Sequence, residues 1–273
     1  MIVGYMFLIG FFTACIGSIA GLGGGMIFIP SMLFLSKFHP QFSWVNPQTV
    51  VGMSLAVMVI TALSSTLTYF KQKTVDIKTG MMFLLAGIPG SLTGVYVNRL
   101  MDGNEFYIYF GVLMILISFM FSVRTNIPER TDIQKKKGVK RTFHVKGETY
   151  TYSFSPVPAM GIAFVVGVVS GLFGIGGGSL MVPVMVLIFG FPIHIAVATT
   201  MFIILISSSI GTLAHISLGH IFWEHVLFFL PGAWIGGVAG AKMNHRLKGD
   251  TIEILFSVLL VMIGIRLIWN GFM

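Results

Sequence analysis

Long apolar runs separated by short polar stretches make up the hydrophobic pattern of this chain. Asp, Glu, Lys and Arg are absent from Met1–Ser36, Phe38–Phe70 and Thr149–Trp223, and a helix that crosses a bilayer needs about 20 apolar residues. The pattern therefore predicts membrane helices in two series around a polar stretch: 2–20, 26–36, 47–70, 79–98 and 105–124, then 157–173, 179–190, 194–218, 225–241 and 251–270.

Three segments match between the two series, in the same order. GLGGGMIFIP at Gly21–Pro30 matches GIGGGSLMVP at Gly174–Pro183, with five of ten positions identical. Two weaker matches follow: Val51–Tyr69 with Val197–His215, and Pro89–Gly94 with Pro231–Gly236. The order of the matches indicates an internal duplication.

The duplication predicts an all-α polytopic membrane protein with 8–10 membrane segments. Each half would hold a glycine-broken helical hairpin followed by three transmembrane helices. We expect the first transmembrane repeat over 1–124, a basic linker over 125–155 and the second transmembrane repeat over 156–273.

Composition supports the membrane class. The 273 residues are 55% hydrophobic and 10% charged, whereas soluble domains carry roughly 25% charged residues. A soluble enzyme is thereby excluded. The net charge of +8 lies in the loops between apolar segments, where it reports membrane orientation and does not indicate nucleic-acid binding.

The distribution of basic residues predicts which loops face the cytoplasm. Arg124–Glu148 holds eight Lys or Arg against three Asp or Glu, which places it in the cytoplasm. Two further clusters would share that side: Lys71, Lys73 and Lys78, and Lys242, Arg246 and Lys248. This count places both termini outside a cell membrane (inner or plasma) and gives the halves opposite orientations, as in many secondary transporters.

The glycine-broken pairs are the unusual elements of this topology. Their second legs, 26–36 and 179–190, are too short for a ~30 Å bilayer core at ~1.5 Å per residue. We expect hairpins that dip into the membrane and return, while full crossing by tilted legs stays open. Separately, Arg141–Phe154 alternates polar and apolar residues around Lys146-Gly147, which predicts a small cytoplasmic β-hairpin. It would act as a linker or as a regulatory or partner-binding element.

The glycine motifs carry the candidate chemistry. An unwound turn inside the membrane exposes N–H groups, and the short helix that follows carries about +0.5 charge at its N-terminus. Two such starts would bind an oxyanion without a basic side chain. The alternative is that the glycines only allow close helix packing. The candidate substrate-binding residues are Gly21, Gly23, Gly24, Gly25 and Met26, with Gly174, Gly176, Gly177, Gly178 and Ser179.

Polar side chains at matching places in 47–70 and 194–218 extend this candidate site. Hydroxyl groups can donate to an anion or bond across helices. Tyr69 and His215 align near the ends of these segments, and a histidine can titrate near neutral pH. Each is otherwise an interfacial residue. The added candidates are Ser54, Ser65, Thr200, Ser208, Tyr69 and His215.

All nine acidic residues lie in loops or at segment ends. Proton relays and many cation sites use carboxylates within the membrane, so the pattern argues against a cation transporter. The apolar segments show no metal-ligand or nucleophile–base spacing. We therefore expect no catalytic residue, no metal and no cofactor, and the protein is not expected to be an enzyme.

The doubled Gly-x-Gly-Gly-Gly…Pro signature at Gly21–Pro30 and Gly174–Pro183 resembles that of the sulfite exporter TauE/SafE family. The resemblance covers nearly the whole chain, including its size and its two halves joined by a polar loop. It implies a permease for a small sulfur-containing anion of the sulfite, sulfonate, sulfoacetate or thiosulfate class.

These expectations combine into a secondary transporter that works by alternating access, with the halves rocking about an anion held between the glycine hairpins. Two alternatives remain: a passive anion channel, and a membrane scaffold or sensor that uses the basic loop. The expected partners are a small anionic substrate and the lipid bilayer, and not nucleic acid. The particular anion, the direction, the coupling ion and any homo-oligomer stay open.

Overall fold

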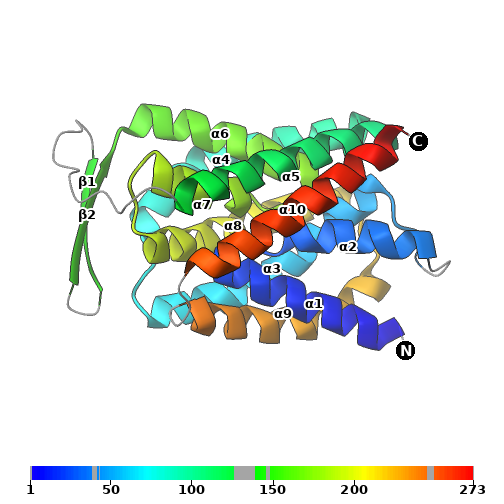
Figure 1. Ribbon diagram of the computed structural model, residues 1–273, viewed down its shortest axis with the longest axis horizontal. Coiled ribbons are helices and arrows are strands. Elements are labelled where there is room, and N and C mark those ends of the chain that lie inside the picture. Colours follow the sequence, from blue (N-terminus) through cyan, green and yellow to red (C-terminus); the bar gives the residue numbers. More distant parts are fainter. Residues whose placement is uncertain are drawn as a thin grey trace.

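The computed structural model describes residues 2–38, 42, 44–125, 139–145, 148–244 and 249–272. Within these ranges the chain forms ten helices and two strands (Figure 1). Their bounds are α1 Ile2–Ala20, α2 Gly25–Phe38, α3 Pro47–Lys71, α4 Ile77–Leu100, α5 Gly103–Thr125, β1 Val139–Val145, β2 Glu148–Phe154, α6 Pro156–Phe173, α7 Gly178–Leu187, α8 Ile193–Ser217, α9 Trp223–Asn244 and α10 Gly249–Phe272.

Helix length and composition confirm the all-α polytopic membrane class. Seven helices in the described ranges are long and apolar enough to cross a membrane. By contrast, α2 has 14 residues and α7 has 10, so they reach only about 21 and 15 Å. These two short helices are the second legs of the glycine-broken pairs, and α7 ends three residues before the predicted limit.

Local capping explains where two of the long helices begin. Pro47 occupies the first turn of α3, and Asn46 before it accepts a hydrogen bond from the Thr49 N–H at 2.9 Å. Asp76 caps α4 in the same way, accepting from the Thr79 N–H at 3.1 Å. These side chains satisfy N–H groups that a helix start leaves without partners.

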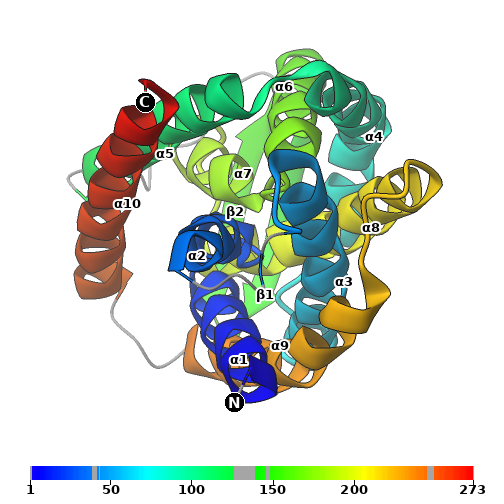
Figure 2. The same ribbon diagram turned by 90° about the vertical axis from the view of Figure 1, so that its right-hand side faces the viewer.

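The most extensive helix packing joins the two sequence halves. α1 packs along α9, α6 packs along α4, and the central α3 packs against α8. α5 and α10 form a further pair beside these (Figure 2). α1 and α6 occupy equivalent places in the two halves, as do α4 and α9. The pairing of α1 with α9 is therefore equivalent to that of α6 with α4, as a duplication predicts. We call α1 with α9, and α4 with α6, the crossed pairs, because each contains one helix from either half. The division at 1–124, 125–155 and 156–273 is therefore a division of the sequence and not of separately packed units.

Glycines allow the two helices within each crossed pair to approach closely. A Cβ atom on Gly94 of α4 would overlap the carbonyl oxygen of Val168 in α6. A Cβ atom on Gly236 of α9 would overlap the carbonyl oxygen of Phe11 in α1. Small residues let helix backbones touch inside a membrane, where packing drives association.

The two glycine-broken pairs lie at opposite ends of the bundle. α1 begins and α2 ends at the end that also holds both termini (Figure 1). α6 begins and α7 ends at the other end, where Phe154 of β2 packs against Phe189 at 5.7 Å between ring centroids. Each pair thus starts and finishes on one side. The opposite orientation of the halves in a membrane stays a prediction.

The predicted β-hairpin is confirmed. β1 and β2 pair antiparallel from Val139↔Phe154 to Val145↔Glu148, and the hairpin starts two residues earlier than expected. The rest of the predicted linker, 126–138, and the turn at 146–147 lie outside the described residues, as do Arg246 and Lys248.

The hairpin contacts loops from both halves. The Tyr152 hydroxyl donates to Asp76 Oδ2 at 2.7 Å, and the Tyr152 ring lies 3.9 Å from that of Phe191. Burial, together with this bond to Asp76, raises the pKa of Tyr152 well above its usual value, so the hydroxyl stays a donor. Asp76 belongs to the α3–α4 connection and Phe191 to the α7–α8 connection, so one strand ties the two halves together.

Candidate functional site

Two glycine turns separate α1 from α2 and α6 from α7. Three glycines in each turn have φ values between +66° and +92°, a region that residues with a Cβ atom rarely adopt. The sequence therefore needs glycine here for backbone conformation, beyond any need for close packing. The six positions are Gly21, Gly23 and Gly24, and Gly174, Gly176 and Gly177.

The structure brings the two turns into contact with each other. A Cβ atom on Gly25, at the start of α2, would lie 2.5 Å from the carbonyl oxygen of Gly174. The reciprocal contact is the same: a Cβ atom on Gly178, at the start of α7, would lie 2.5 Å from the carbonyl oxygen of Gly21. The N-termini of both short helices therefore meet in the interior of the bundle, beside the central helices.

Met58 and Ile204 close the space between the turns. A Cβ atom on Gly23 or on Gly176 would overlap the Met58 Cε methyl group. Ile204 also lies 3.1 Å from the Cβ position of either glycine. Both side chains are buried. The space where an anion is expected is therefore filled by apolar side chains in this structure.

The hydroxyl groups nearest the turns differ between the halves. Ser54 Oγ donates to the Gly174 carbonyl oxygen at 2.8 Å. The hydroxyl of its counterpart Thr200 contacts Met185 Sδ at 3.5 Å, and the Thr200 methyl group lies 3.1 Å from the Cβ position of Gly178. Ser179, in the first turn of α7, is fully buried and its Oγ has no hydrogen-bond partner. The equivalent residue in α2, Met26, is buried and apolar. A buried hydroxyl without a partner costs stability and is uncommon.

Ser65 and Ser208 bond mainly to backbone. Ser65 Oγ donates to the Thr61 carbonyl oxygen at 2.7 Å and lies 2.5 Å from Ser18 Oγ. Ser208 Oγ donates to the carbonyl oxygen of Ile204, one turn earlier in α8. The helix-bonding alternative accounts for these two hydroxyl groups, and within the described residues neither forms a hydrogen bond to a glycine turn.

Tyr69 and His215 are not brought together. Gly52 near the start of α3 packs against His215 near the end of α8, its Cβ position 3.2 Å from that ring, so the two helices are antiparallel. The Tyr69 hydroxyl donates to the Ser18 carbonyl oxygen at 2.9 Å. His215 Nδ1 pairs with His220 Nδ1 at 3.0 Å at the other end. One small anion cannot contact both side chains.

Two asparagines that sequence reasoning missed anchor the helices before the turns. Asn98 Nδ2 of α4 donates to the Leu172 carbonyl oxygen at 2.8 Å, and Asn244 Nδ2 of α9 donates to the Ile19 carbonyl oxygen at 2.6 Å. The interval from Asn98 to Asn244 equals that from Tyr69 to His215, so the two asparagines align when the two halves are superimposed in sequence. Extending that alignment would have found the pair. Met58 and Ile204 align at the same spacing, but nothing distinguishes them from ordinary apolar residues.

Comparison with known proteins identifies the family. The sequence model of Sulfite exporter TauE/SafE matches residues 6–267. The chain belongs to the TauE/SafE family. The match covers both glycine turns and nearly the whole chain.

Relatives support a transport role for this TauE/SafE chain. It is 46% identical to the probable membrane transporter protein YunE of Bacillus subtilis, over 97% of this chain and 96% of the relative. It is 25% identical to the probable membrane transporter protein YdhB of B. subtilis, over 90% of each chain. A probable membrane transporter protein of Methanocaldococcus jannaschii is 22% identical, over 95% and 93%. The protein is a multi-pass membrane transporter. No solved structure matches the chain.

Proposed function

We propose that the protein carries a small sulfur-containing anion through alternating access, with the paired glycine turns as its binding site. The observation that carries this proposal is the meeting of the α2 and α7 N-termini, with the unpartnered hydroxyl of Ser179 at the start of α7. Helix starts attract negative charge. The residues that form the turns and border them carry no acidic group that would repel an anion.

The contacts of Met58 and Ile204 define what must move. Both fill the position between the turns that an anion would take. Met58 has three rotatable bonds and adapts easily, so rotation of its side chain clears space beside Gly23 and Gly176. The described conformation is thus the closed state of the proposed cycle.

The moving bodies would be the crossed pairs and not the sequence halves. α1 with α9, and α4 with α6, are joined by backbone contacts at glycines along their length. Each pair carries one of the helices that lead into a glycine turn. A displacement of one pair against the other would open the site first to one side and then to the other, as alternating access requires.

The test is a double substitution with a matched control. Gly24→Val with Gly177→Val places β-branched residues at φ values of +92° and +68°, which distorts both turns. Gly4→Val with Gly161→Val adds the same volume where no atom lies within 4 Å of the Cβ position. In proteoliposomes we expect uptake of sulfite, thiosulfate or sulfoacetate to be lost only in the first protein. Equal uptake by both proteins would refute the site.

Counterflow and electrical recording separate the proposal from a channel. A transporter exchanges labelled anion against an internal excess of unlabelled anion and saturates, whereas a passive channel gives unitary currents. Saturable counterflow is the expected outcome. If correctly folded protein moves none of these anions, the scaffold alternative is favoured.

We also propose that the hairpin end of the bundle faces the cytoplasm of the cell. Lys71, Lys73 and Lys78 lie in or beside the α3–α4 connection, whose Asp76 bonds to Tyr152 of the hairpin. Both termini lie at the other end of the bundle (Figure 1), in accord with the positive-inside rule. An alkaline phosphatase fusion after Met273 should be active in cells, because this reporter folds outside the cytoplasm. An inactive phosphatase with a fluorescent GFP fusion at the same place would reverse the orientation.

A further inference from the structure

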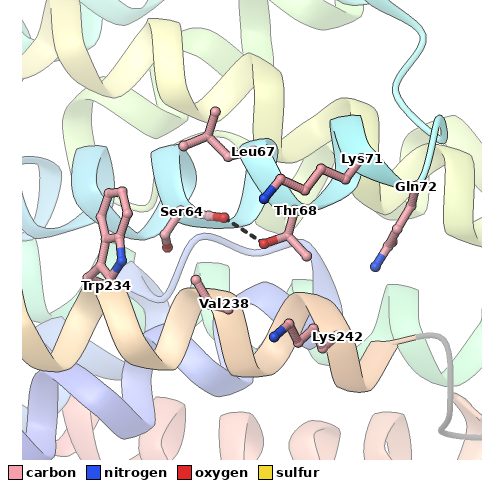
Figure 3. Close-up of a pocket in the computed structure, with 8 residues that line it drawn as sticks. All are labelled: Ser64, Leu67, Thr68, Lys71, Gln72, Trp234, Val238 and Lys242. Atoms are coloured by element: carbon pink, nitrogen blue, oxygen red, sulfur yellow. Dashed lines mark hydrogen bonds between the residues drawn. The ribbon is translucent and has the colours of Figure 1, made fainter.

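A groove lies between α3 and α9 at the hairpin end of the bundle, separate from the glycine turns. It has a volume of about 360 Å³. Figure 3 shows the lining side chains on α3 and on α9. The lining residues are Ser64, Leu67, Thr68, Lys71 and Gln72 of α3, and Trp234, Val238 and Lys242 of α9.

The groove is basic at one end and apolar at the other. Lys71 lies near the end of α3 and Lys242 near the end of α9, on the two sides of the groove (Figure 3). Trp234 lies two turns before Lys242 in α9. Thr68 Oγ1 already donates to the Ser64 carbonyl oxygen at 2.9 Å, so its hydroxyl oxygen still has lone pairs to accept. None of the eight lining residues is acidic. The groove is thus complementary to a molecule with an anionic head and an apolar body.

The apolar part of the groove faces the outside of the bundle. Leu67 is 46% exposed and Trp234 is 42% exposed. Exposed apolar side chains in the middle of a membrane helix contact acyl chains. A small soluble anion would gain no binding free energy from these apolar side chains, whereas a lipid acyl chain would bury their surface.

We propose that this groove binds an anionic phospholipid, with its phosphodiester between Lys71 and Lys242 and an acyl chain along Leu67, Val238 and Trp234. Lysines near the membrane surface each contribute measurably to the binding of anionic lipid. Both lysines carry the exposed, flexible side chains that can reach a headgroup from a helix end. Bound there, the lipid joins α3 of the central pair to α9 of a crossed pair.

Trp234 gives a direct measurement, because bromine atoms on a lipid tail quench the fluorescence of a nearby tryptophan. Purified full-length protein is titrated with dibrominated phosphatidylglycerol and, separately, with dibrominated phosphatidylcholine. We expect saturable quenching by the first lipid at much lower concentration, and loss of that component in Trp234→Phe. Equal quenching by both lipids overturns the headgroup assignment.

A matched pair of double substitutions tests the lysines. Lys71→Gln with Lys242→Gln removes both charges from the groove, and we expect binding about 30-fold weaker. Lys73→Gln with Lys78→Gln removes the same charge from exposed positions outside the groove, and binding should change less than twofold. An equal loss in both variants would mean that general surface charge attracts the lipid, and would overturn the proposal.

Soluble competitors separate a lipid site from a site for a free anion. Inorganic phosphate, glycerol 3-phosphate and sulfite share the anionic chemistry but lack acyl chains. At millimolar concentration they should leave the quenching by phosphatidylglycerol nearly unchanged. Full displacement by any of them would assign the groove to a soluble anion. Because the readout is binding, its failure is distinct from a failure of the proposed transport site.

Discussion

Asn98 and Asn244 make equivalent hydrogen bonds between the two halves of the chain: Asn98 of the first half bonds to the second half, and Asn244 of the second half bonds to the first. Asn98 holds the carbonyl oxygen of the next-to-last residue of α6, and Asn244 holds that of the next-to-last residue of α1. Both carbonyl groups lie at helix ends, which leave such groups without helical partners. Each crossed pair of helices is therefore fastened at the point where its glycine turn begins.

Replacing either asparagine by alanine should destabilise the protein by about 1–3 kcal/mol and lower the maximal transport rate, because a buried carbonyl group loses its donor. Asn244→Ala should cost more, since Asn244 Oδ1 also contacts His194 Nδ1 at 3.1 Å. Asn98 Oδ1 has no partner. Thermal unfolding and initial transport rates measure the two effects. Asn270→Ala, which removes an exposed bond to Lys37, is the control and should behave as the unmodified protein.

Met58 should become accessible only when the closed site opens. With Cys15→Ser the chain has no other cysteine, so Met58→Cys provides a single thiol between the glycine turns. We expect slow labelling by a water-soluble maleimide, and a rate that changes when a transported anion is added. Ser217→Cys, at an exposed helix end, should label quickly at all times. Rapid, anion-independent labelling at position 58 would contradict the closed conformation.

Tyr152→Phe should loosen the hairpin while leaving the glycine turns unchanged. The substitution removes the hydroxyl donor to Asp76 and keeps the ring beside Phe191. We expect a loss of about 1–2 kcal/mol and faster hydrogen exchange of the β2 amides. Tyr109→Phe alters a hydroxyl on a residue that is 55% exposed and should change neither. Unchanged exchange in Tyr152→Phe would show that aromatic packing alone holds the strand.

Protonation of His220 should lower the free energy of unfolding as the pH falls. Burial, and secondarily the nearby positive charge of Arg99, lower the pKa of this imidazole below 6.5. The folded state therefore binds the proton more weakly than the unfolded state, so its stabilising contribution is present above pH 6.5 and is lost below it. Thermal unfolding between pH 8 and pH 5 should show a drop that His220→Gln reduces. Parallel curves for the two proteins would exclude this contribution.

Much of the fold is predictable from local pattern. The central helix predicted over 47–70 is observed as Pro47–Lys71, and the predicted hairpin is observed with its strands ending at Phe154. The glycine turns are predictable as breaks because glycine disfavours a continuous helix, and their positive φ values are ones that glycine adopts readily. Their contact with each other was expected from the proposed inversion and is present.

The candidate site was harder to predict. Ser54 and Ser179 lie at the turns as expected, but Ser65 and Ser208 bond to backbone, and Tyr69 and His215 lie at opposite ends of the antiparallel α3 and α8. Alignment shows which residues are equivalent in the two halves. Because α3 and α8 occupy equivalent places in the two halves but run antiparallel, residues that align near the ends of these helices lie at opposite ends of the bundle.

The sequence by itself determined the membrane class, the approximate positions of the helices and the two breaks, because apolar run length and glycine conformation are properties of neighbouring residues. Only the tertiary structure decided that α1 packs on α9, that α4 packs on α6, and that Met58 and Ile204 close the space between the turns. Those outcomes depend on which helix surfaces fit together across long distances in the chain, where every surface is apolar and shape complementarity makes the selection.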